Sequence, residues 1–401
     1  MNRIPEDASG GGSADRPLKP ATRLVTAGRV PSEQFGFVNT PIYRGSTVLY
    51  PNAEKFLKRD AKYTYGTKGT PTTNSFEVAW TELCGAAGTV LVPSGLAAIS
   101  IALLSCLKAD DHLLVPDSVY RPTRNFCDSV LKRFGVQTTY YDPLLGAEIT
   151  KLFQPNTRAV FTEAPGSLSF EMQDIPAIAA AAHARDMIVL MDNTWATPLF
   201  FPPHAHGVDL AIEAGTKYCS GSSDLLLGMV SANERCWREL RATFDTMAIC
   251  AGPEDVFLAL RGLRTMRVRL LHHQESALAV AKWFAGRPEV ARVLHPALPS
   301  DPGHAIWMRD FSGASGLFSI VLKPMADKAA HAFINALTLF GIGASWGGFE
   351  SLAIPFDCAA FRTATTWDPG GPTIRFHIGL EDVGDLIADL ERGFAAMRAT
   401  V

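Results

Sequence analysis

The sequence predicts an α/β protein with a large domain built on a mostly parallel sheet and a smaller C-terminal α+β domain. The chain has 401 residues, enough for two or three domains of roughly 100–200 residues each. Short strand-like segments alternate with helical segments over the first two thirds of the chain, which indicates βαβ units. Beyond about residue 262 this alternation gives way to a long helical segment and a second set of strands.

The elements of the large domain are predicted from apolar runs and from the residues that begin and end them. Residues 187–191, MIVLM, form a continuous apolar run, which indicates a strand buried on both faces. Residues 175–184 are rich in alanine and follow Asp174, which suits the N-cap of a helix. The other elements predicted for this domain are the helices 75–83, 96–107 and 124–134 and the strands 89–92, 112–115, 136–141, 159–162 and 210–214.

The second domain is predicted from the elements that follow the change of pattern. A long helical segment over 264–284 precedes apolar stretches at 317–322 and 330–340, a strand over 373–378 and an amphipathic helix over 382–397. Residues 21–69 contain many Pro, Gly and Tyr residues and little periodicity. We therefore divide the chain into a disordered leader (1–20), an N-terminal arm (21–69), a large domain (70–265) and a C-terminal α+β domain (266–401).

The composition argues against several classes of protein. The 37 Lys and Arg residues and 40 Asp and Glu residues give a net charge of −3, so we expect no nucleic-acid partner and no polybasic membrane contact. No apolar stretch reaches the roughly 18 residues of a membrane-spanning helix. The seven cysteines are scattered and include no C-x-x-C pair, so we expect reduced thiols in a cytoplasmic protein.

Two histidine pairs suggest a metal at first sight. They are His204 with His206, and His272 with His273. No Cys or carboxylate lies at a spacing that would complete a zinc site, so we interpret them as surface or core histidines and expect no metal. In open parallel sheets, ligands bind at the carboxyl ends of the strands, so we expect the ligand-binding and catalytic residues to lie where the predicted strands end.

The first such place is the segment VPSGLAA, where the strand 89–92 ends and a helix of small residues begins. The backbone N–H groups at the start of that helix, around Gly95 and Leu96, are free to bind an anion. Gly95 would allow the backbone to approach a ligand closely. An ordinary strand–helix turn explains the segment equally well, because it matches neither a Walker loop nor a G-x-G-x-x-G motif.

Two further places carry charged residues. Asp192 directly follows an apolar strand, where a poorly solvated carboxylate needs a cationic partner. It suits a metal ligand, a catalytic acid, the partner of a protonated ring nitrogen, or a simple cap. Lys217 follows the strand 210–214, where burial would lower the pKa of its amine and make it nucleophilic. An anion cradle, an aspartate and such a lysine are together the parts of a pyridoxal-phosphate site.

Five short sequence motifs also resemble those of a known enzyme family. The sequence contains YGTKGTPT from residue 65, DNTW from 192, TKY from 216, SWGGFES from 345 and RFHIGLED from 375. From about residue 22 to 397 it resembles the Cys/Met-metabolism family of pyridoxal-phosphate enzymes, and within it the cystathionine β-lyases. The resemblance implies a fold-type-I, aspartate-aminotransferase-like structure with pyridoxal 5′-phosphate held as a Schiff base on Lys217.

The resemblance also implies roles at the cofactor. Lys217 would remove the Cα proton and later protonate the leaving sulfur, and Asp192 would keep the pyridine nitrogen protonated. Tyr120 matches the aromatic residue that stacks on the cofactor ring. Thr216 would bind the phosphate together with the start of the helix at Gly95 and Leu96.

Other matches place residues at the substrate. Arg375 corresponds to the arginine that binds the substrate α-carboxylate, and its planar fork suits bidentate contact. Ser345 and Trp346 would lie beside that carboxylate, and a tryptophan at this position is typical of the β-lyases. Tyr65 matches a tyrosine that reaches the substrate, the cofactor and the reacting atoms in the neighbouring subunit. The resemblance therefore implies a homo-oligomer built as a dimer of site-sharing dimers.

One position departs from the family pattern. The family commonly has an arginine that contacts the phosphate two residues after the arm tyrosine, where this chain has Thr67. Either Lys68 takes over the contact or phosphate binding is weaker.

The implied activity is α,β-elimination of L-cystathionine, or a related cysteine thioether or cystine, to homocysteine or another thiol, pyruvate and ammonia. Two alternatives stay open. The first is γ-elimination or γ-replacement on the same scaffold, in which Lys217 would also remove a proton at Cβ. The second is a pyridoxal-phosphate-binding regulatory protein with little catalysis.

Overall fold

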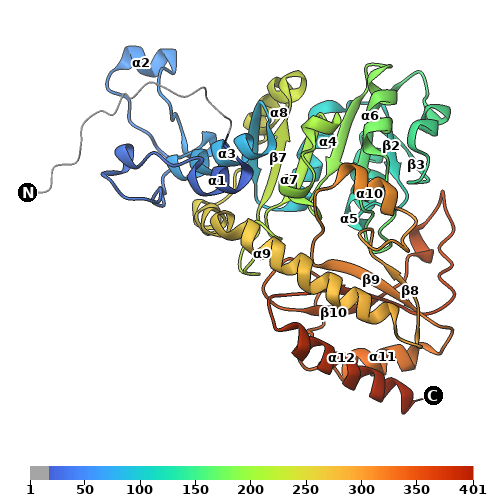
Figure 1. Cartoon of the computed structure of the whole chain (residues 1–401). Coiled ribbons are helices and arrows are strands. Elements are labelled where there is room, and N and C mark those ends of the chain that lie inside the picture. Colours follow the sequence, from blue (N-terminus) through green and yellow to red (C-terminus); the bar gives the residue numbers. More distant parts are fainter. Residues whose placement is uncertain (1–17, 401) are drawn as a thin grey trace, which may run out of the picture.

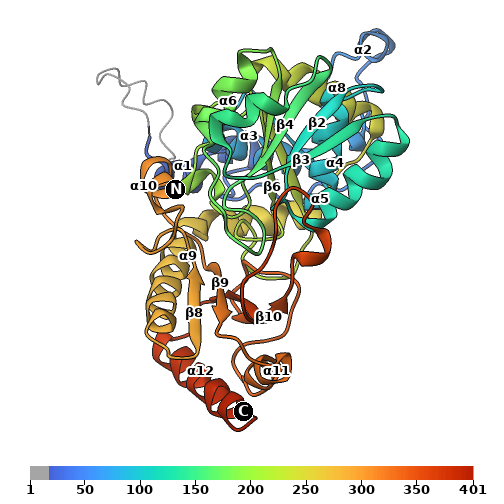
Figure 2. The same cartoon turned by 90° about the vertical axis from the view of Figure 1, so that its right-hand side faces the viewer.

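Two β-sheets and a long helix that joins them organise the chain (Figure 1). The computed structural model describes residues 18–400, so residues 1–17 of the predicted leader lie outside the described part. The larger sheet lies in the upper part of Figure 2 and the smaller sheet below it, with helix α9 (Pro253–Ala285) running beside both. Within residues 18–400, no helix is both long enough and apolar enough to cross a membrane.

The larger sheet has seven strands in the order β1-β7-β6-β5-β4-β2-β3. The strands from β3 to β6 pair in parallel, and β7 runs antiparallel to both of its neighbours. The prediction of a mostly parallel sheet is thus confirmed. The strands are β1 (Gly88–Val92), β2 (His112–Pro116), β3 (Gln137–Tyr141), β4 (Thr157–Glu163), β5 (Ile188–Asp192), β6 (Leu210–Ala214) and β7 (Gly228–Ala232).

Helices cover both faces of this sheet, because alternate strand residues are apolar on each side. Leu190 and Ile212 pack with α4 and α8, whereas Val189 and Met191 face the opposite layer. That opposite layer contains α3, α6 and the first half of α9. We call the larger sheet with the helices that pack on it the large unit, and the second sheet with its helices the smaller unit. The helices of the large unit are α3 (Pro71–Cys84), α4 (Gly95–Cys106), α5 (Arg121–Phe126), α6 (Ile175–His183), α7 (Thr197–Phe200) and α8 (Glu234–Met247).

The second sheet is fully antiparallel, in the order β10-β11-β9-β8. Its core is rich in phenylalanine, with Phe284, Phe318 and Phe376 fully buried between the sheet and its helices. Its elements are β8 (Val290–Leu294), α10 (His304–Asp310), β9 (Leu317–Leu322), α11 (Asp327–Asn335), β10 (Leu352–Phe356), β11 (Thr373–His377) and α12 (Val383–Arg398).

The predicted elements differ from the structure in a few places, each with a physical reason. Strand β7 has the sequence GMVSA, in which small residues hide the apolar run, so it was not predicted. Helix α5 begins at Arg121, before the predicted start, because Pro122 suits the first turn of a helix, and a π-helical turn continues it to Leu131. The predicted domain boundary at residue 265 falls inside α9, whose first half packs in the large core and whose second half packs in the smaller one.

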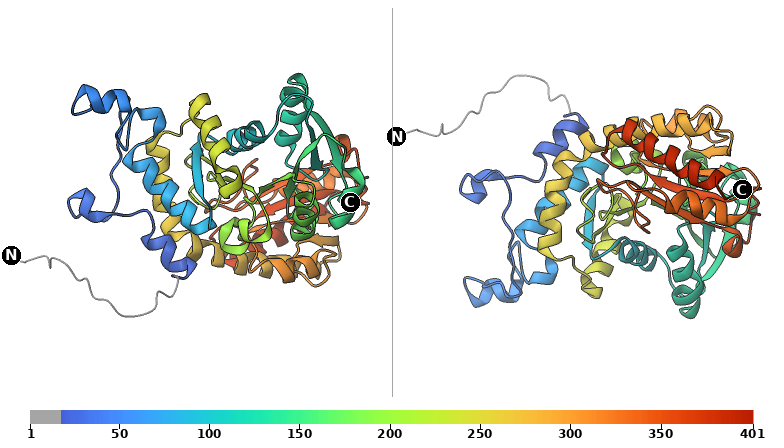
Figure 3. Two further views of the ribbon diagram at one scale, coloured as in Figure 1. Left: turned by 90° about the horizontal axis from the view of Figure 1, so that it is seen from above. Right: turned by 90° about the horizontal axis from the view of Figure 1, so that it is seen from below.

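The arm stands away from the body of the molecule (Figures 1 and 3). It carries α2 (Ala53–Lys58), and several of its large apolar side chains are exposed, among them Phe35, Leu49 and Leu57. At its start, however, α1 (Pro20–Thr26) is a helix that the sequence did not predict. Leu24 of α1 is buried in the large core, and Arg264 of α9 donates hydrogen bonds to the carbonyl oxygens of Leu24 and Ala27.

Candidate active site

A cavity of about 300 Å³ lies where the carboxyl ends of the parallel strands meet the second sheet. This is the position at which open α/β sheets bind ligands, and the volume is sufficient for a small cofactor or substrate. Most of the residues predicted for the site line this one cavity: Gly95, Leu96, Tyr120, Asp192, Thr216, Lys217, Ser345, Trp346 and Arg375.

Lys217 brings an amine to the floor of the cavity. It follows β6, and its Nζ donates a hydrogen bond of 2.6 Å to Oγ of Ser345. The same Nζ lies 5.1 Å from the centre of the Trp346 ring. Burial and the positive charge of Arg375 lower the pKa of Lys217 to about 8, although the nearby Asp192 opposes the shift. About a tenth of this amine is therefore unprotonated at pH 7, far more than for an ordinary lysine, and can act as a base or nucleophile.

Asp192 ends β5 beside the amine. Its Oδ1 accepts hydrogen bonds from the backbone N–H of Thr194 at 3.0 Å and from the Thr194 hydroxyl at 2.5 Å. That hydroxyl oxygen also accepts the N–H of Ala214, so Thr194 ties the carboxylate to the end of β6. Burial raises the pKa of Asp192, and the bonds from Thr194 counteract the rise. Thr194 was not predicted; a hydroxyl two residues after the aspartate was the signal that could have found it.

Arg375 supplies a buried cation. It lies in the middle of β11 with 7% of its surface exposed, and its Nη2 donates to the carbonyl oxygens of Gly343, Ala344 and Ser345. Its Nε is buried without a hydrogen-bond partner, and no carboxylate pairs with its guanidinium among residues 18–400. Burial lowers its pKa to about 10. A buried guanidinium without a counter-ion is suited to an anionic ligand.

Tyr120 and Glu163 form one wall. The backbone N–H of Tyr120 donates a 2.8 Å hydrogen bond to Oε2 of Glu163, while the Tyr120 side chain is partly exposed and lines the cavity. Glu163 ends β4 directly opposite Asp192 in the strand register. Burial, and then the charge of Asp192, raise the pKa of Glu163 well above its ordinary value. Sequence reasoning missed Glu163, although it follows an apolar strand as Asp192 does.

The start of α4 forms another wall, beside Thr216. Ser94 caps this helix of 12 residues by accepting the N–H of Ala97. A Cβ at Gly95 would lie 2.8 Å from Cβ of Ala214, so a larger residue would not fit there. The hydroxyl of Thr216 is hydrogen-bonded to the backbone of Leu227 and borders the same space. Free N–H groups at a helix start, with a hydroxyl beside them, suit a phosphate.

The segment that holds Trp346 presses against the lysine. Gly347 has a φ of +90°, and a Cβ at this position would lie 2.9 Å from Cα of Lys217. Its N–H donates to Nε2 of His377, and the Trp346 ring lies 5.5 Å from that of Tyr218. Glycine is therefore required after Trp346 both by its conformation and by the close approach.

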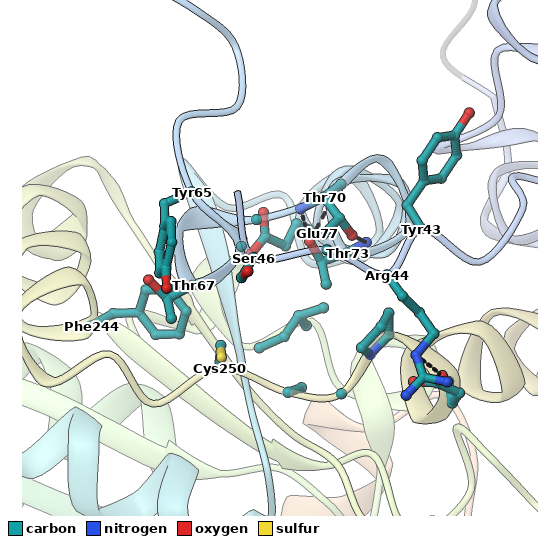
Figure 4. Close-up of a pocket in the computed structure, with 18 residues that line it drawn as sticks. Tyr43, Arg44, Ser46, Tyr65, Thr67, Thr70, Thr73, Glu77, Phe244 and Cys250 are labelled. Carbon is teal, nitrogen blue, oxygen red and sulfur yellow. Dashed lines mark hydrogen bonds and ion pairs between the residues drawn. The ribbon is translucent and has the colours of Figure 1, made fainter. Parts of the chain in front are cut away.

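Three predicted site residues stand apart from this cavity within one chain. Tyr65 and Thr67 border a different hollow, lined mainly by the arm and by residues near the start of α9 (Figure 4). Lys68 turns to its own chain, where Nζ donates to the carbonyl oxygen of Asp245 at 2.7 Å and lies 3.5 Å from its Oδ1. Their roles in a neighbouring subunit stay predictions.

The histidine pairs have partners in the protein. His204 contacts the backbone oxygen of Val208 through Nδ1 and the Ser231 hydroxyl through Nε2. His273 is buried with Nδ1 against the carbonyl oxygen of Ile378.

The sequence pattern of the Cys/Met metabolism PLP-dependent enzymes matches residues 21–395. The chain belongs to this family. The family depends on pyridoxal phosphate, and the cavity fits that group: Asp192 suits a ring nitrogen, the start of α4 and Thr216 suit the phosphate, and Lys217 suits the aldehyde carbon.

Individual relatives support this assignment. The chain is 44% identical to cystathionine beta-lyase MetC of Escherichia coli, with 95% of this chain and 99% of the relative covered. It is 56% identical to a Rhizobium johnstonii protein provisionally described as a cystathionine beta-lyase, over 94% of this chain and 96% of that one. The crystal structure of MetB from Corynebacterium glutamicum superimposes with a TM-score of 0.87 at 29% identity, covering 94% and 98% of the two chains. The predicted fold-type-I architecture is thus confirmed.

Proposed function

We propose that this enzyme is a carbon–sulfur lyase that performs α,β-elimination on L-cystathionine and gives homocysteine, pyruvate and ammonia. The observation that carries the proposal is the position of the Lys217 amine, with its lowered pKa, in one cavity with the partly buried carboxylate of Asp192 and with the buried guanidinium of Arg375, which has no carboxylate partner among residues 18–400. The relatives named cystathionine beta-lyase point to the same reaction.

Each step of this reaction is assigned to particular residues of the chain. Arg375 binds the α-carboxylate of the amino acid and so fixes the Cα–H bond relative to Lys217. Lys217 takes the proton from Cα and delivers a proton to the departing sulfur, and Ser345 holds its Nζ in place. Asp192 holds a proton at the ring nitrogen of the cofactor, and Tyr120 and Trp346 exclude water from the two sides. Pyridoxal phosphate, when bound, supplies the electron sink for the charge that develops at Cα.

The γ-elimination and γ-replacement alternative uses the same groups and one further proton removal at Cβ. Trp346 supports the β-lyase, because its indole lies 5.1 Å from the Lys217 amine and takes up space beside the reacting carbons.

A second copy of this chain is the proposed partner. The arm exposes apolar side chains in the single chain, including Phe35, which is 95% exposed, and Tyr65 stands outside the cavity that holds Lys217. An arm that covers the neighbouring subunit would bury that surface and bring Tyr65, Thr67 and Lys68 to the neighbour's cofactor. The seven cysteines are free in the described chain, which supports our placement of the enzyme in the cytoplasm.

Product analysis tests the proposal. The purified, cofactor-loaded enzyme is incubated with L-cystathionine, and the keto acid and the thiol are identified. Pyruvate with homocysteine is the expected result. 2-Oxobutyrate with cysteine would instead assign the γ-lyase reaction, and a bound cofactor without either product would favour the regulatory protein.

A further inference from the structure

A carboxylate close to the cavity joins the two halves of the molecule. Asp117 directly follows β2, and its side chain is completely buried. Its Oδ1 and Oδ2 accept the backbone N–H groups of Thr363, Ala364 and Thr365 at distances of 2.8 to 3.1 Å. The hydroxyl of Thr365 adds a bond of 2.7 Å to Oδ2. These donors lie some 246 residues further along the chain than their acceptor.

The donors belong to the segment that connects β10 and β11 of the smaller sheet, which we call the clasp loop (residues 357–372). Arg362, which belongs to this loop, has only 3% of its side chain exposed and pairs at 3.0 Å with Oε1 of Glu171 in the large unit. Arg124 of α5 completes the arrangement, with Nη2 at 2.5 Å from Oδ1 of Asp117. The Arg124–Asp117 ion pair lies within the large unit and holds the carboxylate in place. The hydrogen bonds to Asp117 and the Arg362–Glu171 ion pair then fasten one loop of the smaller unit to the larger one.

Both sides of this contact are close in sequence to residues that line the cavity. Tyr120 lies three residues after Asp117, and α5, which carries Arg124, begins right after Tyr120. On the other side, the clasp loop runs into β11, which carries Arg375. Tyr120 of the large unit and Arg375 of the smaller sheet both line the cavity.

Stability alone gives a weak reason for such a buried charge. Taking a carboxylate and a guanidinium out of water costs free energy that the ion pair often returns only in part, and in some proteins such pairs impose one specific arrangement. We propose that Asp117 is a positioning residue: by holding the clasp loop against the end of β2, it fixes Tyr120 relative to Arg375 and so sets the geometry in which the amino acid is bound. This inference rests on the proposed function of the cavity.

The chain contains a matched control. Asp389 of α12 is also completely buried and accepts N–H groups from Thr338 and Leu339, the Thr338 hydroxyl and the Arg392 guanidinium. All of these partners belong to the smaller unit, and none of them lines the cavity. Asp117→Asn and Asp389→Asn thus remove the same kind of charge from the same kind of site, once beside the cavity and once away from it.

The experiment compares the two variants as cofactor-loaded enzymes. Both are expected to unfold at a lower temperature. Only Asp117→Asn is expected to lower kcat/KM for cystathionine, by about tenfold or more, mainly through a higher KM, since small displacements of binding groups cost this much. The midpoint of the pH titration of cofactor absorbance should also move in Asp117→Asn and stay unchanged in Asp389→Asn. Thr365→Val removes the hydroxyl bond to Asp117 and the bond that the hydroxyl accepts from Arg362, and it should show a smaller change in the same direction.

Two outcomes overturn the proposal. One is equal kinetic and absorbance behaviour of the two aspartate variants, which would make Asp117 a stabilising contact only. The other, decisive if Asp117→Asn fails to fold, is a Thr365→Val variant with wild-type KM and absorbance. If the wild-type enzyme releases no pyruvate from cystathionine, the proposed function fails, but the absorbance titration still tests the role of Asp117.

Discussion

The Nζ atom of Lys217 and the Oγ atom of Ser345 are 2.6 Å apart and join the two sheets inside the cavity. Lys217 follows the last strand of the parallel series, whereas Ser345 precedes β10 of the antiparallel sheet. Burial lowers the pKa of this amine most and the charge of Arg375 in the second sheet lowers it further, so the full shift requires both units. The catalytic group and the group that binds the substrate are parts of one electrostatic arrangement.

The first prediction concerns the stability of the cofactor-free protein. The pKa of Lys217 falls from an ordinary value of 10.5 to about 8 in the folded chain, so the charged amine is costly there. Between these two values the unfolded chain binds more protons, and stability rises with pH. Lys217→Met should be more stable than the wild type at pH 7, and the difference should shrink from pH 8 upward. Urea unfolding of both proteins across this range measures it; a constant difference would contradict the shift.

The second prediction concerns the paired N–H donors of the Arg375 guanidinium. Arg375→Lys keeps a positive charge but loses the planar pair of donors, so the amino-acid carboxylate would be held by one contact instead of two. Loss of one charged hydrogen bond is worth about 1.5–3 kcal/mol, so kcat/KM should fall roughly tenfold to a hundredfold. Steady-state kinetics give the value, with Arg238→Lys as the control because its side chain is 90% exposed on α8. Equal kinetics in the two variants would show that Arg375 does not contact the substrate.

The third prediction separates two roles of Glu163. Burial and then the neighbouring Asp192 raise the pKa of this carboxyl well above its ordinary value, which favours the neutral form, and the carboxyl accepts the Tyr120 N–H. Glu163→Gln keeps an acceptor oxygen and should retain near-wild-type kcat/KM. Glu163→Leu leaves the N–H without a partner, which should cost about 1–3 kcal/mol of stability and lower activity through Tyr120. Urea unfolding and kinetics measure both effects. A Gln variant as impaired as the Leu variant would mean that the native carboxyl is ionised.

Much of the site could be predicted from the sequence, because parallel strands bring their carboxyl ends to one edge. Gly95, Asp192 and Lys217 each follow an apolar strand-like run, and the structure places all three around one cavity. Glu163 also follows an apolar strand, but no charged or glycine-rich motif beside it marked it as a site residue. Arg375 was found through the family resemblance, since an arginine inside a strand has no local pattern that marks it.

Other features depend on contacts that local sequence does not encode. The clasp of Asp117 joins residues 246 positions apart, and neither end has a distinctive pattern. Helix α1 is stabilised by Arg264 and by burial of Leu24, both of which arise only when α9 packs against it. The extent of α9 itself follows from its contacts with both cores, so no change of composition marks residue 265 as a boundary.

The last prediction tests whether sites are shared between subunits. Tyr65 borders a hollow separate from the Lys217 cavity, so a chain with Tyr65→Phe and a chain with Lys217→Ala carry defects in different parts of a shared site. Each variant alone should be weakly active or inactive. When both are co-expressed, the hybrid dimers contain one site with an intact tyrosine and an intact lysine, and about a quarter of all sites should work if assembly is random. The activity of the whole co-purified mixture, relative to the wild type, measures this fraction. An activity no higher than the average of the two separate variants would place Tyr65 outside the neighbouring site, and the arm would then have a purely structural role.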